Sequence, residues 1–109
     1  DGILTDFAAF CKQQEIEADI LFQNYDRGNI KSEDSIAILL KLIEYAKQTK
    51  KVKLHAAAVK NQLVYSMELQ GTNVKISPRV FRKYVKRYDG GINIESKDGK
   101  TRIILGLRR

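Results

Sequence analysis

An Asp-Gly pair near the end of the chain, Asp98-Gly99, limits the possible folds more than any other feature of the sequence. Apolar residues occupy alternate positions on both sides of this pair: Ile92, Ile94, Ile103, Leu105 and Leu107. A period of two is typical of strands. Both central residues of a type I′ turn need positive φ, and an Asp-Gly pair tolerates this conformation. The sequence therefore predicts a β-hairpin over residues 92–109.

Before Gly90-Gly91 the apolar residues recur with the spacing of helices, and four helices and one short strand are predicted. The helices are expected over residues 3–25, 33–49, 56–70 and 78–88, and the strand over residues 52–54. Ser77 and Pro78 mark the start of the last helix, because a proline at that position leaves no N–H unbonded. The predicted fold class is α+β and mostly helical. A single domain over 1–109 would consist of an N-terminal helical extension (1–25) and a core (32–109) that ends in the C-terminal β-hairpin.

The second predicted helix shows its pattern most clearly. Ser32 is a good N-cap, and Glu33 and Asp34 follow it in the first turn, where the helix dipole favours negative charge. The spacing i, i+3, i+4 and i+7 predicts a buried face made of Ile36, Leu39, Leu40 and Ile43.

The helix predicted over residues 78–88 has two faces of opposite character. Its apolar face consists of Val80, Phe81, Tyr84, Val85 and Tyr88, and its charged face of Arg79, Arg82, Lys83, Lys86 and Arg87. Cations three and four residues apart on a helix repel each other by roughly a few tenths of a kcal/mol per pair. A bound polyanion would offset that repulsion, so the charged face is predicted to bind nucleic acid.

The charges are also segregated along the chain. The net charge is +7, from 20 Lys and Arg against 13 Asp and Glu. Residues 1–49 hold five basic and nine acidic residues, a net charge of −4, and residues 50–109 hold fifteen basic and four acidic residues, a net charge of +11. A strongly basic half favours a polyanionic partner.

The element order over residues 32–109 resembles that of the winged helix-turn-helix domains: helix, short strand, helix, basic helix, hairpin. This resemblance implies that the basic helix enters the major groove of duplex DNA through Arg79, Arg82, Lys83, Lys86 and Arg87. It implies further contacts from the hairpin through Lys97, Lys100 and Arg102, with Arg108 and Arg109 extending the basic surface. DNA is favoured as the partner, and RNA stays open.

A second hypothesis is a protein-interaction or accessory subunit module of a larger replication, transcription or RNA-processing assembly. The acidic N-terminal half would then dock a protein partner. In both hypotheses the chain is part of a larger protein or complex, and its oligomeric state stays open.

Catalytic, metal and cofactor sites are not expected. His55 has no carboxylate near it in the sequence, and Cys11 lies on an apolar stripe, where a buried thiol is the ordinary outcome. These two residues cannot assemble a zinc site, and the glycines match no phosphate-binding loop. A single cysteine favours a reducing compartment, cytoplasmic or nuclear. No apolar run approaches the roughly 20 residues that span a bilayer, so no membrane partner is expected.

Overall fold

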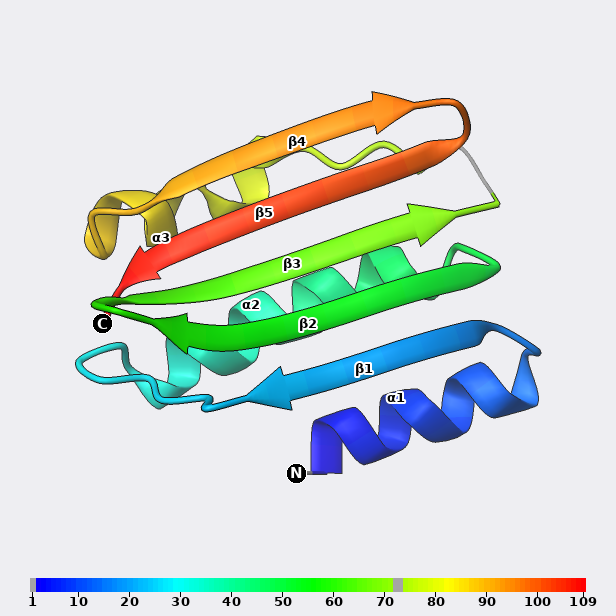
Figure 1. Cartoon of the computed structure of the whole chain (residues 1–109), viewed down its shortest axis with the longest axis horizontal. Helices are drawn as coiled ribbons and strands as arrows, with labels where there is room; N and C mark the ends of the chain where they lie inside the picture. Colours follow the sequence, from blue (N-terminus) through cyan, green and yellow to red (C-terminus); the bar gives the residue numbers. More distant parts are fainter. Residues whose placement is uncertain (1, 72–73) are drawn as a thin grey trace.

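The computed structural model describes residues 2–71 and 74–109 and shows a sheet covered on one face by helices (Figure 1). The elements follow the order α1 (Gly2–Gln13), β1 (Glu17–Gln23), α2 (Ser32–Ala46), β2 (Lys51–Val59), β3 (Gln62–Gln70), the 3-10 helix η1 (Pro78–Phe81), α3 (Arg82–Arg87), β4 (Gly91–Lys97) and β5 (Lys100–Arg108). The protein is a two-layer α/β structure. The predicted fold class, mostly helical with a winged-helix core, is therefore wrong.

The sheet has the strand order β1-β2-β3-β5-β4. β1 runs parallel to β2, because α2 connects them across one face of the sheet. The other neighbouring strands are antiparallel. β5 is the last strand in the chain, yet it lies between β3 and β4. The C-terminal hairpin is thus built into the sheet and does not project from a helical core.

The helix predicted over residues 56–70 is wrong. β2 and β3 pair there from Lys51↔Gln70 to Val59↔Gln62, and the short strand predicted at 52–54 is the beginning of the longer β2. Leu63 and Met67 are four residues apart, and positions four apart share a face in a strand as they do in a helix. Tyr65 lies between these two residues and Leu69 lies after them, and both are also buried. Burial of every second residue distinguishes a strand from a helix. The period is therefore two.

The helix predicted over residues 3–25 is half right. α1 ends at Gln13, and Glu15 adopts a positive φ of 56° before β1 begins. Ile16 and Ile20, again four residues apart, suggested a continuing helix. In β1 the side chains of Ile20 and Phe22 point toward the core, and Leu21 between them faces outward with 41% of its surface exposed.

The helix α2 is confirmed, but with a different buried face. Lys31 is the N-cap and Ser32 begins the helix, where the Ser35 hydroxyl donates to the Ser32 carbonyl. The buried positions are Asp34, Ser35, Ile38, Leu39, Leu42, Ile43 and Ala46. Ile36 and Leu40 are 42% and 50% exposed, so half of the predicted face points away from the core. No helix in the described part of the chain is long and apolar enough to cross a membrane.

The hairpin is confirmed. β4 and β5 pair from Gly91↔Gly106 to Lys97↔Lys100, and Asp98 and Gly99 have φ of 52° and 77°. Gly90 marks the other end of the hairpin. A Cβ atom at Gly90 would lie 2.0 Å from the Gly106 carbonyl oxygen, so only glycine fits where α3 turns into β4.

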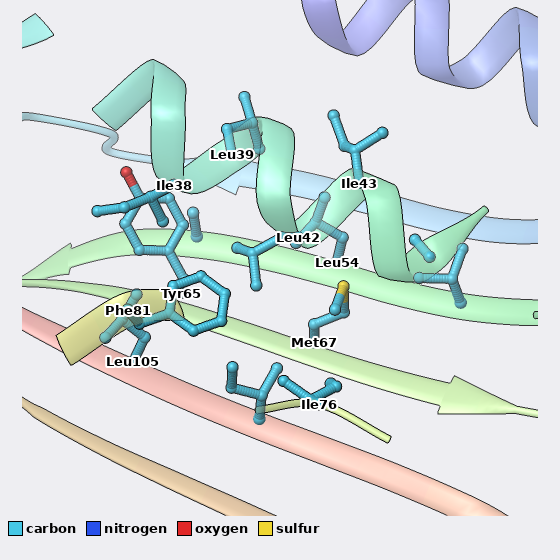
Figure 2. Close-up of a cluster of buried hydrophobic side chains, with 14 of the residues drawn as sticks. Ile38, Leu39, Leu42, Ile43, Leu54, Tyr65, Met67, Ile76, Phe81 and Leu105 are labelled. Carbon is cyan, nitrogen blue, oxygen red and sulfur yellow. The ribbon is translucent and has the colours of Figure 1, made fainter. Parts of the chain in front are cut away.

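The core lies between α2 and the inner face of the sheet (Figure 2). Ile38 and Leu42 of α2 face Leu54, Tyr65, Met67 and Leu105 of three neighbouring strands, and Phe81 of η1 closes the same layer. Each fully buried side chain of this size contributes about 1.5–3 kcal/mol. This shared core fixes the position of η1 and α3 relative to α2.

Candidate functional site

The segment predicted as a basic helix is helical, in two pieces. Ser77 accepts a hydrogen bond from the Arg79 N–H at 3.3 Å, Pro78 opens η1, and α3 continues to Arg87. Phe81 and Tyr84 are buried beneath it. The side chains of Arg79, Arg82, Lys83 and Lys86 are exposed.

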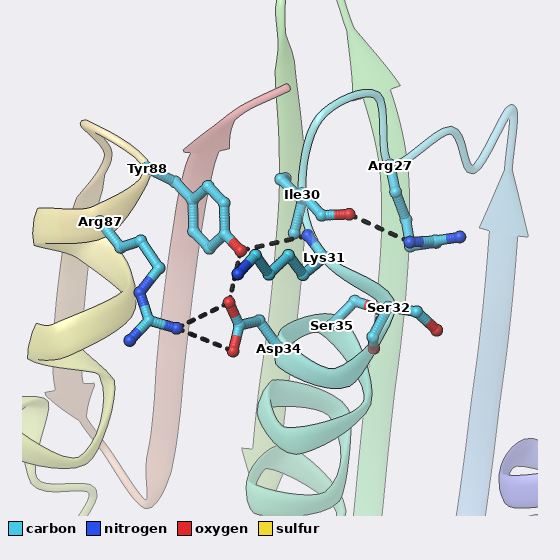
Figure 3. Close-up of polar contacts among 8 residues, drawn as sticks. All are labelled: Arg27, Ile30, Lys31, Ser32, Asp34, Ser35, Arg87 and Tyr88. Carbon is cyan, nitrogen blue, oxygen red and sulfur yellow. Dashed lines mark hydrogen bonds and ion pairs between the residues drawn. The ribbon is translucent and has the colours of Figure 1, made fainter.

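Arg87, the fifth predicted cation of this helix, is paired with an acid of α2 (Figure 3). Its guanidinium donates to both carboxylate oxygens of Asp34 at 2.8 and 3.0 Å, and the Tyr88 hydroxyl donates to the same carboxylate. The hydrogen bond from Tyr88, joined by those from Arg87, holds the pKa of Asp34 below its ordinary value. Arg87 therefore fastens α3 to the N-terminal turn of α2.

A second contact joins the opposite ends of the two helical segments. The Tyr45 hydroxyl, near the end of α2, accepts a hydrogen bond from the Ser77 N–H at 3.5 Å. Asp34 near the start of α2 meets Arg87 at the end of α3. α2 and the η1–α3 segment therefore run antiparallel to each other, held at both ends.

A hollow of about 180 Å³ lies between these segments, lined by Lys41, Glu44, Tyr45, Gln48 and Val80. We refer to it as the α2–α3 groove. Lys41, Glu44 and Tyr45 occupy positions i, i+3 and i+4 of α2, which lie on one face of a helix, and Gln48 follows just after the helix ends. Val80 comes from η1, and Lys83 lies one helical turn after it.

The donor set of the groove suits an anion better than a metal. Glu44 is its one carboxylate and lies one turn from the Lys41 ammonium. Asp34, at the end of the same helix face, is occupied by Arg87 and Tyr88. Among residues 2–71 and 74–109, no group of three His, Cys, Asp or Glu side chains could hold a metal ion. Lys41 lies in the lining, and the exposed Lys83 lies one turn after Val80.

Comparison with solved structures identifies the fold. No family model and no curated protein matches the sequence. The structure superposes on the catalytic domain of histidine kinase ThkA with a TM-score of 0.74, over 98% of this chain and 87% of that chain, at 14% identity. The histidine kinase AdeS of Acinetobacter baumannii gives 0.62 over 98% of this chain and 61% of that chain, at 16% identity. The blue-light-activated histidine kinase EL346 of Erythrobacter litoralis gives 0.65 over 94% and 39%, also at 16% identity.

The chain has the fold of a histidine kinase catalytic domain. The winged-helix resemblance over residues 32–109 is therefore wrong, since it rested on a helix at 56–70 that is a pair of strands. The same finding overturns the predicted recognition helix and wing, and the prediction of duplex DNA or RNA as the partner.

Three further predictions are corrected by the same finding. The prediction of a non-catalytic chain is wrong, because the histidine kinase fold found here is that of enzyme catalytic domains. The alternative of an accessory or protein-interaction module in a replication, transcription or RNA-processing assembly finds no support among these structures. The same holds for a protein partner docked through the acidic N-terminal half.

In the histidine kinase fold, the hairpin cations lie apart from those of α3. The register places Arg102 of β5 between Glu68 and Glu95, and Lys53 between Asp19 and Glu68. These residues alternate in charge across the open face, on the side of the sheet away from the helices. Strand pairing therefore places acids beside cations on this face, although the two charges are segregated along the chain.

Three of the predicted cations of the hairpin and the C-terminal end form ion pairs. Lys100 lies 3.7 Å from Glu68, and Arg108 lies 3.4 Å from Asp89. Arg109 lies 2.5 Å from Asp26 and donates to the Lys60 carbonyl at 2.7 Å. Lys97 is exposed at the end of β4. The structure thus gathers Arg79, Arg82, Lys83 and Lys86 on one segment and disperses the other predicted site residues.

His55 and Cys11 lie outside the groove. His55 is on the open face of the sheet, 3.2 Å from Asp19 of β1, a partner that is 36 residues away in the sequence. Cys11 is buried, as predicted, and burial raises the pKa of its thiol.

Sequence reasoning missed the α2 side of the groove. Lys41, Tyr45 and Gln48 form a polar stripe at helical spacing, and that signal was available in the sequence. What the sequence could not show is which segment faces the stripe.

Proposed function

We propose that this chain is a nucleotide-binding domain of a histidine-kinase-type signalling protein, with ATP held at the α2–α3 groove. The fold carries the proposal: it matches a histidine kinase catalytic domain over 98% of the chain. The ThkA structures are described as nucleotide-free forms of the catalytic domain. ATP is the ordinary phosphoryl donor of kinase reactions.

The chemistry of the groove supports the same ligand. Lys41 lines the hollow, and Lys83 lies one turn after its Val80 wall. Lysine binds phosphate as a point charge, and arginine binds it through two parallel hydrogen bonds. A hollow of about 180 Å³ would accommodate part of a nucleotide. The rest would extend along η1 and α3, where Arg79 and Arg82 are exposed.

The phosphoryl acceptor would come from another polypeptide segment. The single histidine of the chain, His55, lies on the open face of the sheet beside Asp19, whereas the groove lies in the helical layer. The domain would therefore present the nucleotide to a histidine that it does not itself carry.

We also place this domain inside the cell. Its single cysteine, Cys11, is a buried free thiol, which is typical of proteins in reducing compartments.

Isothermal titration of the chain with ATP, with and without Mg²⁺, tests the proposal. We expect saturable binding that weakens about tenfold in Lys41→Ala, because the loss of one charge-assisted contact costs about 1.4 kcal/mol. Lys12→Ala is the matched control: Lys12 is an exposed lysine in the last turn of α1 and does not line the groove. Absence of ATP binding under both conditions, or equal loss in the two variants, would contradict the proposal.

A further inference from the structure

The acids near the groove do not form a site for a divalent cation. Mg²⁺ at a nucleotide site takes oxygen ligands, commonly one or two carboxylates together with the phosphates. Glu44 is the one carboxylate in the lining, and Lys41 lies one turn before it on the same helix face. A metal ion at Glu44 would therefore sit beside an ammonium group.

Asp34 is not available in its place. Both of its carboxylate oxygens accept hydrogen bonds from Arg87, and one also accepts from Tyr88. Its residue is 7% exposed, so a metal ion would have to displace these donors from a closed site. The described residues contain no group of three His, Cys, Asp or Glu side chains that could hold a metal ion.

Four cations of η1 and α3, namely Arg79, Arg82, Lys83 and Lys86, are by contrast open to solvent. No carboxylate in residues 2–71 or 74–109 forms an ion pair with Arg79, Arg82 or Lys86, and Lys83 lies over the ring of its neighbour Tyr84 at 5.1 Å. From Pro78 to Tyr88 the segment contains no acid. Repulsion among these side chains falls when an anion lies between them.

We infer that the α2–α3 groove takes the nucleotide polyphosphate without a divalent cation, and that Lys41 and the η1–α3 cations supply the charge that a metal would otherwise supply. This inference rests on the proposed function. A polyphosphate without bound metal carries more negative charge than its metal complex. The cations of the groove therefore favour the metal-free form.

Titration of the full chain with ATP in EDTA and in excess Mg²⁺ tests the inference. We expect ATP to bind about fivefold or more tightly in EDTA, and we expect Mn²⁺ alone to give no protein-bound signal in electron paramagnetic resonance. The double variant Lys41→Ala/Lys83→Ala should lose most of the preference for EDTA. Both lysines are at least partly exposed, so the variant is expected to fold, and its circular dichroism spectrum checks this. Lys12→Ala should keep the preference.

The two proposals fail in different ways. Tighter binding of ATP in Mg²⁺ than in EDTA, or Mn²⁺ bound to the chain, overturns the metal-free site and leaves nucleotide binding standing. A preference for EDTA that survives in the double variant overturns the assignment to these lysines. Absence of ATP binding in both buffers overturns the proposed function and this inference together.

Discussion

Asp34 shows how one residue can hold two helices of this protein in place. Its carboxylate lies in the first turn of α2, where the helix dipole favours negative charge. The carboxylate accepts hydrogen bonds from Arg87, the last residue of α3, and from Tyr88 directly after it. The Lys31 N–H in turn donates to the Tyr88 hydroxyl at 3.1 Å. The charge of Arg87, predicted to face a ligand, is therefore used within the fold.

The first prediction concerns this carboxylate. Asp34→Asn should lower the free energy of unfolding by about 1–3 kcal/mol at neutral pH, because charge-assisted hydrogen bonds to a buried group are lost. Urea unfolding of both proteins measures the difference. Asp19→Asn is the control, since Asp19 is an exposed partner of His55 and should change stability by less than about 1 kcal/mol.

The stabilities of wild type and Asp34→Asn should also depend differently on pH. The folded pKa of Asp34 lies below its unfolded value of about 3.9, so the stabilisation is complete above that pH. It is lost as the pH falls from the unfolded pKa toward the folded one. The gap between wild type and Asp34→Asn should therefore narrow below about pH 4. A gap that widens there would contradict the assigned direction of the shift.

At the scale of elements, α2 was predicted with nearly the right bounds and the wrong rotation. Ile36, Leu40 and Leu42 are all apolar, so the helical wheel of α2 has more apolar positions than the core can bury. Packing against the sheet decides which of these positions are buried. Leu42 is fully buried and Leu40 is half exposed.

This rotation gives a second prediction with a matched pair on one helix. Leu42→Ala should destabilise the protein by about 2–5 kcal/mol, because it leaves a cavity against the sheet. Leu40→Ala should cost about 1 kcal/mol or less, because Leu40 is half exposed at the edge of the core beside α1. Thermal unfolding of the two variants compares them. Similar losses in the two variants would contradict the observed rotation, and a larger loss in Leu40→Ala would show that the helix is turned as the sequence pattern alone suggested.

The sequence predicted elements whose signals are local and missed those whose signals are ambiguous. The Asp98-Gly99 turn demands positive φ, and this located the hairpin. Leu63 and Met67 fit a helix and a strand equally, and only burial of Tyr65 against the core distinguishes them. The groove could not be predicted, because Tyr45 and Ser77 meet across 32 residues of sequence.

At the scale of the whole molecule, the position of β5 distinguishes this fold from a helical core with a wing. β5 pairs with β3 on one side, from Gln62↔Arg108 to Gln70↔Lys100, and with β4 on the other, from Gly91↔Gly106 to Lys97↔Lys100. Its residues Ile103 and Leu105 are buried beneath the helices. β5 is thus part of the cooperative centre of the sheet, although it is the last strand in the chain.

Native-state hydrogen exchange of the intact chain tests this position. Amides of β5 between residues 102 and 106 should exchange only through global unfolding, with the same free energy as those of β3, because no local opening frees a strand paired on both sides. The edge strands β1 and β4 provide the control and should exchange faster, since each is paired on one side. A wing attached to a helical core would open on its own. If β5 exchanged with the lower free energy of a local opening while α2 stayed protected, the central place of β5 in the sheet would be wrong.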